Sequence, residues 1–317
     1  GVARLIGAAP GTVQVQPSTS VALSVVASCL DFSRGGRRKV VTGAHDFPTS
    51  GYVWEEQRRL GAEVIVVPSV DGLRLSTERL LEAIDRKTCL VALSHVSYLS
   101  SHRLDPRPII ARAHEKGALV LLDIYQSAGL LPIEAAAWGV DFLIGGTIKW
   151  LCGGPACGYL YVRPDLMPSL RPRVTGWFAH AAPFDFAHGA IRYDDGVRRF
   201  AQGTPPIPAL YACLPGLEII AEVGLPVIEA ESRRRTDMMI AFATERGWRI
   251  NTPRAAAERG GCVMIGVDRP REIVERLRER RVLVDWRPGV GLRLSPHFFN
   301  TDAEVGEALE ILSRILG

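Results

Sequence analysis

Short apolar runs alternate with amphipathic stretches through the first two thirds of the chain, and this alternation constrains the fold more than any other feature. Apolar residues that recur every three or four positions indicate helices, whereas short continuous apolar runs indicate strands buried on both faces. Strands that alternate with helices are typical of βαβ units and therefore of a mainly parallel sheet. The sequence predicts an α/β fold.

The sheet is predicted from seven apolar runs, at residues 13–15, 39–42, 63–67, 89–93, 119–123, 142–145 and 159–162. Helices are predicted at residues 20–30, 48–60, 77–84, 106–116, 207–222 and 227–246. Between these groups, residues 164–204 are rich in Pro, Arg, His and aromatic side chains and show little periodicity. A long irregular segment of this kind is usually functional or lies at an interface.

The tail, residues 248–317, has the pattern strand, strand, helix, strand, strand, helix. Thr301 and Glu304 have the spacing of a capping box, in which each side chain satisfies an otherwise unpaired amide at the start of a helix. We therefore predict a large domain over residues 1–222 and a small C-terminal α+β domain over residues 223–317.

Composition excludes several classes of protein. The net charge is +4, but the arginines are scattered and do not line one face with aromatic residues, so we expect no nucleic acid partner. Acidic residues interrupt the longest apolar run before it reaches membrane-spanning length. The six cysteines and the histidines lack the spacing of metal ligands, so we expect no metal, reduced thiols and a cytoplasmic location. The chain opens at Gly1 in helix-like sequence, and we expect a natural segment, with any targeting signal, to precede it.

Two ionisable residues stand out in the apolar surroundings of residues 117–162. Asp123 ends one apolar run, and Lys149 follows the next run and precedes a Gly-rich turn. Open α/β sheets bind their ligands at the carboxyl ends of their strands. A lysine is costly to bury, and proteins bury one where a lowered pKa makes its amine a nucleophile. The alternative, in which Lys149 ends a strand and points at water, stays open.

An aspartate and a lysine so placed meet the needs of pyridoxal phosphate. The lysine forms a Schiff base with this cofactor, and the carboxylate keeps the ring nitrogen protonated, so that the ring accepts electrons from the substrate.

Longer runs carry a family resemblance. The runs DIYQSAG and DFLIGGTIKWLCGGPACGYLYV resemble the core of class V aminotransferases, the fold-type I pyridoxal phosphate enzymes that include kynureninases and cysteine desulfurases. HDFPTSGY, SHVSYLSS, GWF with QGTPPI, and GLRLSPHFFNT resemble kynureninase-like members in the same order. The resemblance covers nearly the whole chain. It implies a large domain with a mainly parallel seven-stranded sheet flanked by helices, a small α+β domain, and a family N-terminal segment that this sequence lacks.

The resemblance also assigns residues to the cofactor. Thr19 and Ser20 match positions that hold its phosphate, at the start of a helix whose free amides favour an anion, although an ordinary helix N-cap is the alternative. Phe47 matches the aromatic residue stacked on the pyridine ring, with a core phenylalanine as the alternative. Ser50 lies in the same run, where kynureninases carry an aspartate.

Further matches complete the implied site. Ser94 and Gln126 match positions near the ring and its phenolic oxygen, and Thr147 and Trp177 match positions near the phosphate. Thr204 matches a phosphate contact made by the second subunit, which implies a homodimer with shared active sites. Arg293 matches the arginine that binds the substrate carboxylate through its planar fork, with a surface arginine as the alternative.

The chain departs from the kynureninase pattern at three positions. Kynureninases usually carry a histidine where this chain has Gln126, a tyrosine where it has Ile148, and an aspartate where it has Ser50. Cysteine desulfurases need a nucleophilic cysteine, and residues 285–292 contain none. The first interpretation is a class V aminotransferase-like enzyme acting on an amino acid. A kynureninase-type hydrolase or lyase and a non-catalytic homologue are the alternatives.

Overall fold

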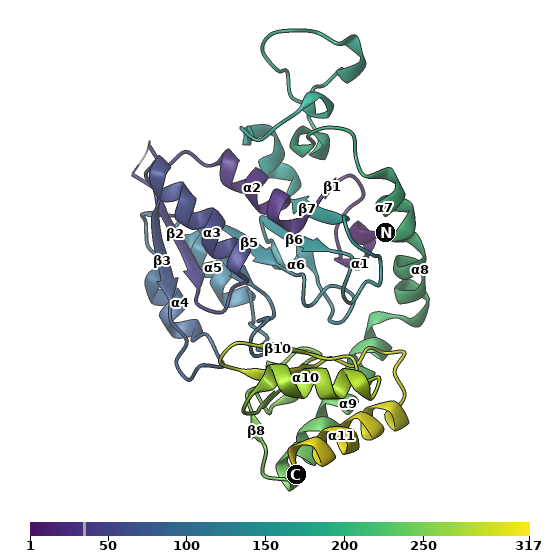
Figure 1. The fold of residues 1–317 in the computed structure, drawn as a ribbon. Coiled ribbons are helices and arrows are strands. Elements are labelled where there is room, and N and C mark those ends of the chain that lie inside the picture. Colours follow the sequence, from purple (N-terminus) through teal and green to yellow (C-terminus); the bar gives the residue numbers. More distant parts are fainter. Residues whose placement is uncertain (34–35) are drawn as a thin grey trace.

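A seven-stranded sheet forms the centre of the large unit in the computed structural model, which describes residues 1–33 and 36–317 (Figure 1). The strand order is β1-β7-β6-β5-β4-β2-β3. Their bounds are Val13–Gln16 (β1), Lys39–Gly43 (β2), Glu63–Val67 (β3), Thr88–Ser94 (β4), Leu119–Asp123 (β5), Phe142–Gly146 (β6) and Gly158–Val162 (β7). All seven predicted strands are confirmed.

The sheet is mainly parallel, as predicted. Strands β3, β2, β4, β5 and β6 pair in parallel, whereas β7 runs antiparallel to both of its neighbours, β6 and β1. The carboxyl ends of β2, β4, β5 and β6 therefore meet at one edge of the sheet. In open α/β sheets this edge is where ligands bind.

Helices cover both faces of the sheet, which explains why its strands are continuously apolar. In β2, Val40 belongs to the core under helices α2 (Thr19–Cys29) and α3 (Pro48–Gln57). Its neighbour Val41 belongs to the opposite core, together with residues of α4 (Thr77–Ala83) and α5 (Arg107–Glu115). Successive side chains of a strand point to opposite faces, so each strand feeds both cores.

One short helix and one helix break differ from the prediction. Helix α1 (Val2–Leu5) agrees with the helix-like start of the chain, whereas α6 (Ala135–Trp138) was not predicted. The single helix predicted over residues 207–222 is two helices, α7 (Ile207–Ala212) and α8 (Leu214–Val223). Pro215, in the first turn of α8, explains the break, because it has no N–H to donate to a carbonyl of the preceding turn and its ring clashes with that carbonyl.

The irregular segment predicted at residues 164–204 is confirmed. It contains only short 3-10 turns among its described elements: η2 (Pro164–Ser169), η3 (Trp177–Ala179), η4 (Pro183–Asp185) and η5 (Val197–Phe200). Part of this segment projects well beyond the body of the large unit, at the top of Figure 1. Trp177, Phe178, Phe184 and Phe186 pack against one another there, yet Phe184 and Phe186 stay 68% and 69% exposed.

The C-terminal unit has a four-stranded antiparallel sheet, ordered β10-β11-β9-β8, within the described residues. Its strands are β8 (Arg249–Ile250), β9 (Val263–Gly266), β10 (Asp285–Arg287) and β11 (Gly291–Leu294). Helices α9 (Leu225–Glu245), α10 (Pro270–Glu279) and α11 (Asp302–Leu316) share its separate core. The predicted element order of the tail is confirmed, and the boundary at residues 222 and 223 stays a prediction.

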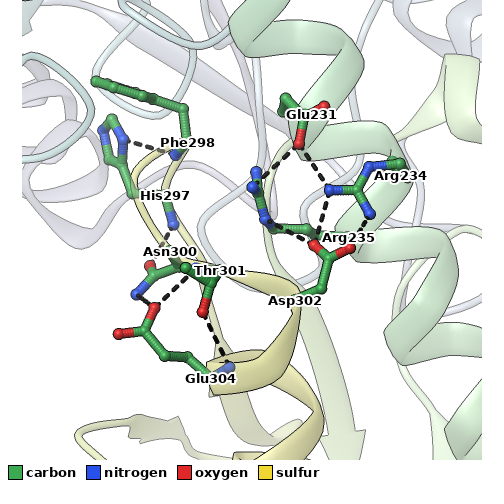
Figure 2. Close-up of polar contacts among 9 residues, drawn as sticks. All are labelled: Glu231, Arg234, Arg235, His297, Phe298, Asn300, Thr301, Asp302 and Glu304. Carbon is green, nitrogen blue, oxygen red and sulfur yellow. Dashed lines mark hydrogen bonds and ion pairs between the residues drawn. The ribbon is translucent and has the colours of Figure 1, made fainter.

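Figure 2 shows how helix α11 begins. Thr301 accepts a hydrogen bond from the amide of Glu304, and the Glu304 carboxylate accepts one from the amide of Thr301, so the predicted capping box is present. Asp302, the next residue, pairs with Arg234 and Arg235 of α9. The start of α11 is thus fixed both by its own cap and by a second helix.

No single helix among the described residues is long and apolar enough to cross a bilayer. The helical stretches Ile207–Val223 and Leu225–Glu245, which meet at a bend of 85°, reach that length and apolar character only when they are taken together.

Candidate active site

A cavity of about 320 Å³ lies at the edge of the large sheet where the carboxyl ends of β2, β4, β5 and β6 meet. The start of α2 and the Gly-rich turn before β7 close its other side. Eight of the predicted site residues line this cavity: Thr19, Ser20, Phe47, Ser50, Ser94, Asp123, Gln126 and Lys149. They come from five separate segments of the chain, and the fold brings them together.

Asp123 is the last residue of β5 and faces the cavity. Its Oδ1 accepts a hydrogen bond from the amide of Tyr125 at 2.8 Å. Burial raises the pKa of Asp123 to about 6, and the nearby Asp46 raises it further, against the opposing effects of the Tyr125 amide and Lys149. The carboxyl group is therefore an unusually good proton acceptor for an aspartate.

Lys149 lies three residues beyond β6 and is half-buried on the cavity wall. Its Nζ sits 4.6 Å from the ring centroid of Tyr125. Burial lowers the pKa of Lys149 to about 8, and the positive charge of Arg293 lowers it further, whereas Asp123 opposes the change. The side chain thus enters the cavity and does not simply end a strand facing water.

The start of α2 provides an anion site. Ser18 is the N-cap, and its Oγ accepts a hydrogen bond from the amide of Val21 at 3.2 Å, so Thr19 and Ser20 are not needed as caps. The Thr19 hydroxyl is buried and has no partner among the described residues, and the Ser20 hydroxyl contacts that of Thr49 at 3.2 Å. Free amides and hydroxyls at a helix N-terminus favour a bound anion.

Aromatic and amide groups form the wall between the anion site and Lys149. Phe47 is 45% exposed and makes an edge contact with Tyr98 at 5.1 Å, so it is not a core phenylalanine. Gln126 is buried, and its side-chain Nε2 has no partner within residues 1–33 and 36–317. A buried amide donor without a partner is costly unless a ligand supplies the acceptor.

Three of the predicted cofactor-binding residues lie outside this cavity lining. The Thr147 hydroxyl is buried and is shared between the carbonyls of Gly154 and Cys157, so it braces the Gly-rich turn. Trp177, 41% exposed, and Thr204, also exposed, lie on the irregular segment. The roles of these three residues at the phosphate stay predictions.

Arg293 is on strand β11 of the small unit and not on the cavity wall. Its flanking residues Leu292 and Leu294 are buried in the small core, so Arg293 projects from the other face of the strand, as predicted. Its effect on the pKa of Lys149 places its charge near the cavity. It is paired with Asp285, a contact that the sequence did not predict.

The sequence also gave no role to Asp46, which directly precedes Phe47. Its Oδ1 accepts a hydrogen bond from the amide of Ser94 at 2.6 Å. Its Oδ2 accepts hydrogen bonds from Thr42 Oγ1 at 2.7 Å and from the amide of Gly43 at 2.8 Å. Asp46 therefore ties the ends of β2 and β4 together beneath the cavity, and an acidic residue just after a buried strand is the signal for it.

The fold and this site define a class of protein, the fold-type I pyridoxal phosphate enzymes. The chain belongs to the class-V aminotransferase family, whose sequence profile matches residues 1–286. Enzymes of this family use pyridoxal phosphate as their cofactor.

The relatives of the chain span several reactions. It is 36% identical to the uncharacterized aminotransferase YcbU of Bacillus subtilis over 97% of this chain and 80% of that protein. It is 32% identical to the kynureninase of Pseudomonas fluorescens over 99% of this chain and 77% of that one. The apo cysteine desulfurase of Thermococcus onnurineus has the same fold, with a TM-score of 0.90 at 22% identity, over 99% of this chain and 82% of that structure.

The residues of the cavity fit pyridoxal phosphate. The unpartnered Thr19 hydroxyl at the helix start suits its phosphate, Lys149 suits its aldehyde, and Asp123 suits its ring nitrogen. The free amide of Gln126 suits its phenolic oxygen. No group of three or more His, Cys, Asp or Glu side chains suited to a metal ion occurs within residues 1–33 and 36–317.

Proposed function

We propose that this protein is a pyridoxal phosphate enzyme that acts on an amino acid by class V aminotransferase-like chemistry, with the cofactor attached to Lys149 as a Schiff base. One observation carries the proposal: the amine of Lys149, the carboxylate of Asp123 and the unpartnered hydroxyl of Thr19 share one cavity. Burial has moved the pKa values of Lys149 and Asp123 toward neutrality, which is typical of catalytic groups.

Each residue has a distinct task. When bound, pyridoxal phosphate supplies an electron-accepting ring that stabilises negative charge on the substrate. Lys149 would hold the cofactor through Nζ and, once the substrate amine has replaced it there, would move the α-proton of the substrate. Asp123 would hold the proton on the ring nitrogen, and Arg293 would bind the substrate carboxylate.

A kynureninase-type hydrolase or lyase is the second candidate, favoured by the 32% identity to the Pseudomonas fluorescens kynureninase. Gln126, Ile148 and Ser50 count against it, because they replace a histidine, a tyrosine and an aspartate of that pattern. Ile148 is 49% exposed at the cavity and carries no proton for transfer. A non-catalytic homologue has no need of a buried amine and carboxylate in one cavity.

The exposed aromatic residues of the irregular segment support a homodimer with shared active sites. Large apolar side chains such as Phe184 and Phe186, when clustered and exposed, mark contact surfaces. In such a dimer Thr204 would reach the phosphate of the partner's cofactor. All six cysteines are free, which supports a cytoplasmic location.

Borohydride reduction tests the proposed cofactor attachment. We expect the protein incubated with pyridoxal phosphate to be yellow, and reduction to remove the visible absorbance and leave a modified Lys149 in a peptide map. Lys149→Ala, the matched control, should bind the cofactor without forming a reducible bond. A wild-type protein that stays colourless with the cofactor would contradict every catalytic interpretation.

Product analysis separates the two reactions. Transamination predicts that an amino donor converts the bound cofactor to its amine form, and the change in the absorbance of the cofactor measures this conversion. A kynureninase predicts that kynurenine yields anthranilate and alanine without that conversion. Screening amino acids for a spectral change identifies the substrate.

A further inference from the structure

A carboxylate faces the predicted substrate-binding arginine across two strands of the small unit. Asp285 of β10 lies directly opposite Arg293 of β11 in the antiparallel register. Strand β10 lies at the boundary between the small and the large unit (Figure 1). Residues opposite each other, and residues two apart on a strand, share one face of a sheet. Arg287 therefore joins Asp285 and Arg293 on the same face.

Asp285 binds only one edge of the Arg293 guanidinium. Arg293 Nε donates to Oδ1 at 2.8 Å, and Nη2 donates to Oδ2 at 2.5 Å. A guanidinium has five N–H donors, so this pair leaves both hydrogens of Nη1 and the second hydrogen of Nη2. Nη1 of Arg293 has no partner in the part of the chain that the structure describes. The free edge is the terminal one, and it can hold a second carboxylate by two parallel hydrogen bonds.

Arg287 holds Asp285 in place from the other side. Its Nη2 lies 3.0 Å from Oδ2 of Asp285, and its Nη1 donates to the carbonyl of Trp286 at 2.9 Å. Trp286 packs against the core of the small unit, so this contact ties the charged group to a rigid element. The exposed fraction of the side chain is 14% for Arg293 and 22% for Arg287. Fixed, half-buried arginines bind carboxylates with less loss of side-chain entropy.

The charges of the group also suit a carboxylate. Two arginines and one aspartate leave a net charge of +1 on this face. The positive charges of both arginines act on Lys149, so the group lies close to the proposed site of chemistry. Asp285 thus offsets part of the positive charge of the two arginines and still leaves a net positive charge for the substrate.

We propose that Asp285 is a positioning residue, which holds Arg293 by its Nε edge so that the terminal Nη edge is presented to the α-carboxylate of an amino acid. This inference rests on the proposed function, because it takes Arg293 as the carboxylate anchor. The opposite possibility is that Asp285 occupies the place of the substrate carboxylate and must be displaced. The two possibilities predict opposite changes in the affinity for the substrate carboxylate when Asp285 is removed.

The first test compares two ligands of the holoenzyme that differ in the carboxylate. L-Alanine and L-alanine methyl ester are titrated against the absorbance of the bound cofactor. We expect Asp285→Ala to raise the Kd of L-alanine about tenfold, since a charge-assisted pair no longer orients Arg293, and to leave the Kd of the ester within about twofold. Asp285→Asn keeps one acceptor and should give an intermediate loss of about threefold, so it serves where Asp285→Ala does not fold.

A matched control removes a carboxylate from another ion pair of the small unit. Glu310→Ala breaks the surface pair with Arg246 and should leave both Kd values unchanged. Tighter binding of L-alanine by Asp285→Ala means that Asp285 competes with the substrate and overturns the proposal. Equal weakening of both ligands means a merely structural role and also overturns it.

A second test needs no cofactor, so it separates this proposal from the proposed function. Sodium propionate is titrated into the apo protein, and the Nε–H signal of Arg293 is followed by ¹⁵N NMR, assigned with Arg293→Lys. We expect the Nε–H of Arg293 to stay protected from exchange with solvent at saturating propionate, because it still donates to Asp285. In Asp285→Ala this protection should be lost. Loss of protection in the wild type on adding propionate shows displacement and refutes the positioning role. A colourless wild type that still shows the protected signal contradicts only the proposed function.

Discussion

Gly158, the first residue of β7, offers the sharpest test of how the anion site is built. A Cβ at this position would lie 2.5 Å from the carbonyl carbon of Ser18 and 2.9 Å from the amide nitrogen of Thr19. Ordinary van der Waals contact begins at 3.4 Å, so the first contact is too short by 0.9 Å. Both neighbours are backbone atoms at the start of α2, and neither can rotate away as a side chain could. Relief requires that the helix start moves away from β7.

We expect Gly158→Ala to lower the free energy of unfolding of the apo protein by about 1–3 kcal/mol, the usual cost of overpacking. It should also weaken pyridoxal phosphate binding about tenfold, because the Thr19 hydroxyl and the amides of α2 move together. Urea unfolding followed by circular dichroism measures the first effect. Absorbance titration with the cofactor measures the second.

Gly51 provides the matched control, in helix α3. It lies inside α3 and is exposed, and a Cβ at this position would have no atom within 4 Å. Gly51→Ala should stabilise the protein by about 0.5–1 kcal/mol, because alanine favours the helix, and should leave the cofactor affinity unchanged. If Gly158→Ala bound the cofactor as tightly as the wild type, the helix start of α2 would not be the phosphate site.

Three further predictions concern the charges and the small unit. Burial lowers the pKa of Lys149 from 10.5 in the unfolded chain to about 8 in the folded one. Below pH 8 the amine is charged in both states, so folding includes the full free-energy cost of burying that charge. Between about pH 8 and 10.5 the unfolded chain binds more protons than the folded one, so the free energy of unfolding rises with pH. Lys149→Met should therefore stabilise the apo protein at pH 7 by up to about 3 kcal/mol, with the advantage fading toward pH 10, and a less stable variant at pH 7 would contradict this. Arg293→Gln should raise the pKa of Lys149 from about 8 toward 10.5 without reaching it, because burial is the larger cause. The pH dependence of reductive methylation measures this change, Arg246→Gln is the control, and an unchanged profile would separate Arg293 from the site. Thr301→Ala removes the capping box of α11 and should cost about 1 kcal/mol in urea unfolding with unchanged cofactor affinity.

Local patterns carried most of the fold. The strands of the large sheet were predictable because each is buried on both faces and therefore continuously apolar, as LVLLD of β5 is. The break between α7 and α8 was missed because the apolar pattern continues across Pro215. The direction of β7 was also beyond local reasoning, since strand direction follows from connection length and packing and not from composition.

The site was predictable where a residue lies at the end of a strand or the start of a helix. Asp123, Lys149 and Thr19 lie at or near such positions, and the resemblance supplied five more lining residues: Ser20, Phe47, Ser50, Ser94 and Gln126. Asp46 and Asp285 were missed for one physical reason: each acts through a residue on another strand, and the register that brings the two together is not visible in either segment alone.

The reactivity of the site follows from the cavity and not from Lys149 alone. At pH 7 an ordinary lysine with a pKa of 10.5 is neutral roughly once in three thousand, whereas Lys149, with a pKa of about 8, is neutral roughly once in ten. The same burial raises the pKa of Asp123 to about 6. At pH 7 the carboxyl group is then mostly ionised, but it accepts a proton more readily than an ordinary aspartate does. One desolvated space thus shifts the pKa of both groups in the direction that their proposed roles require. Burial is the largest cause of both pKa shifts. We therefore expect substitutions that open the cavity to water to return the pKa values of Lys149 and Asp123 toward their ordinary values together.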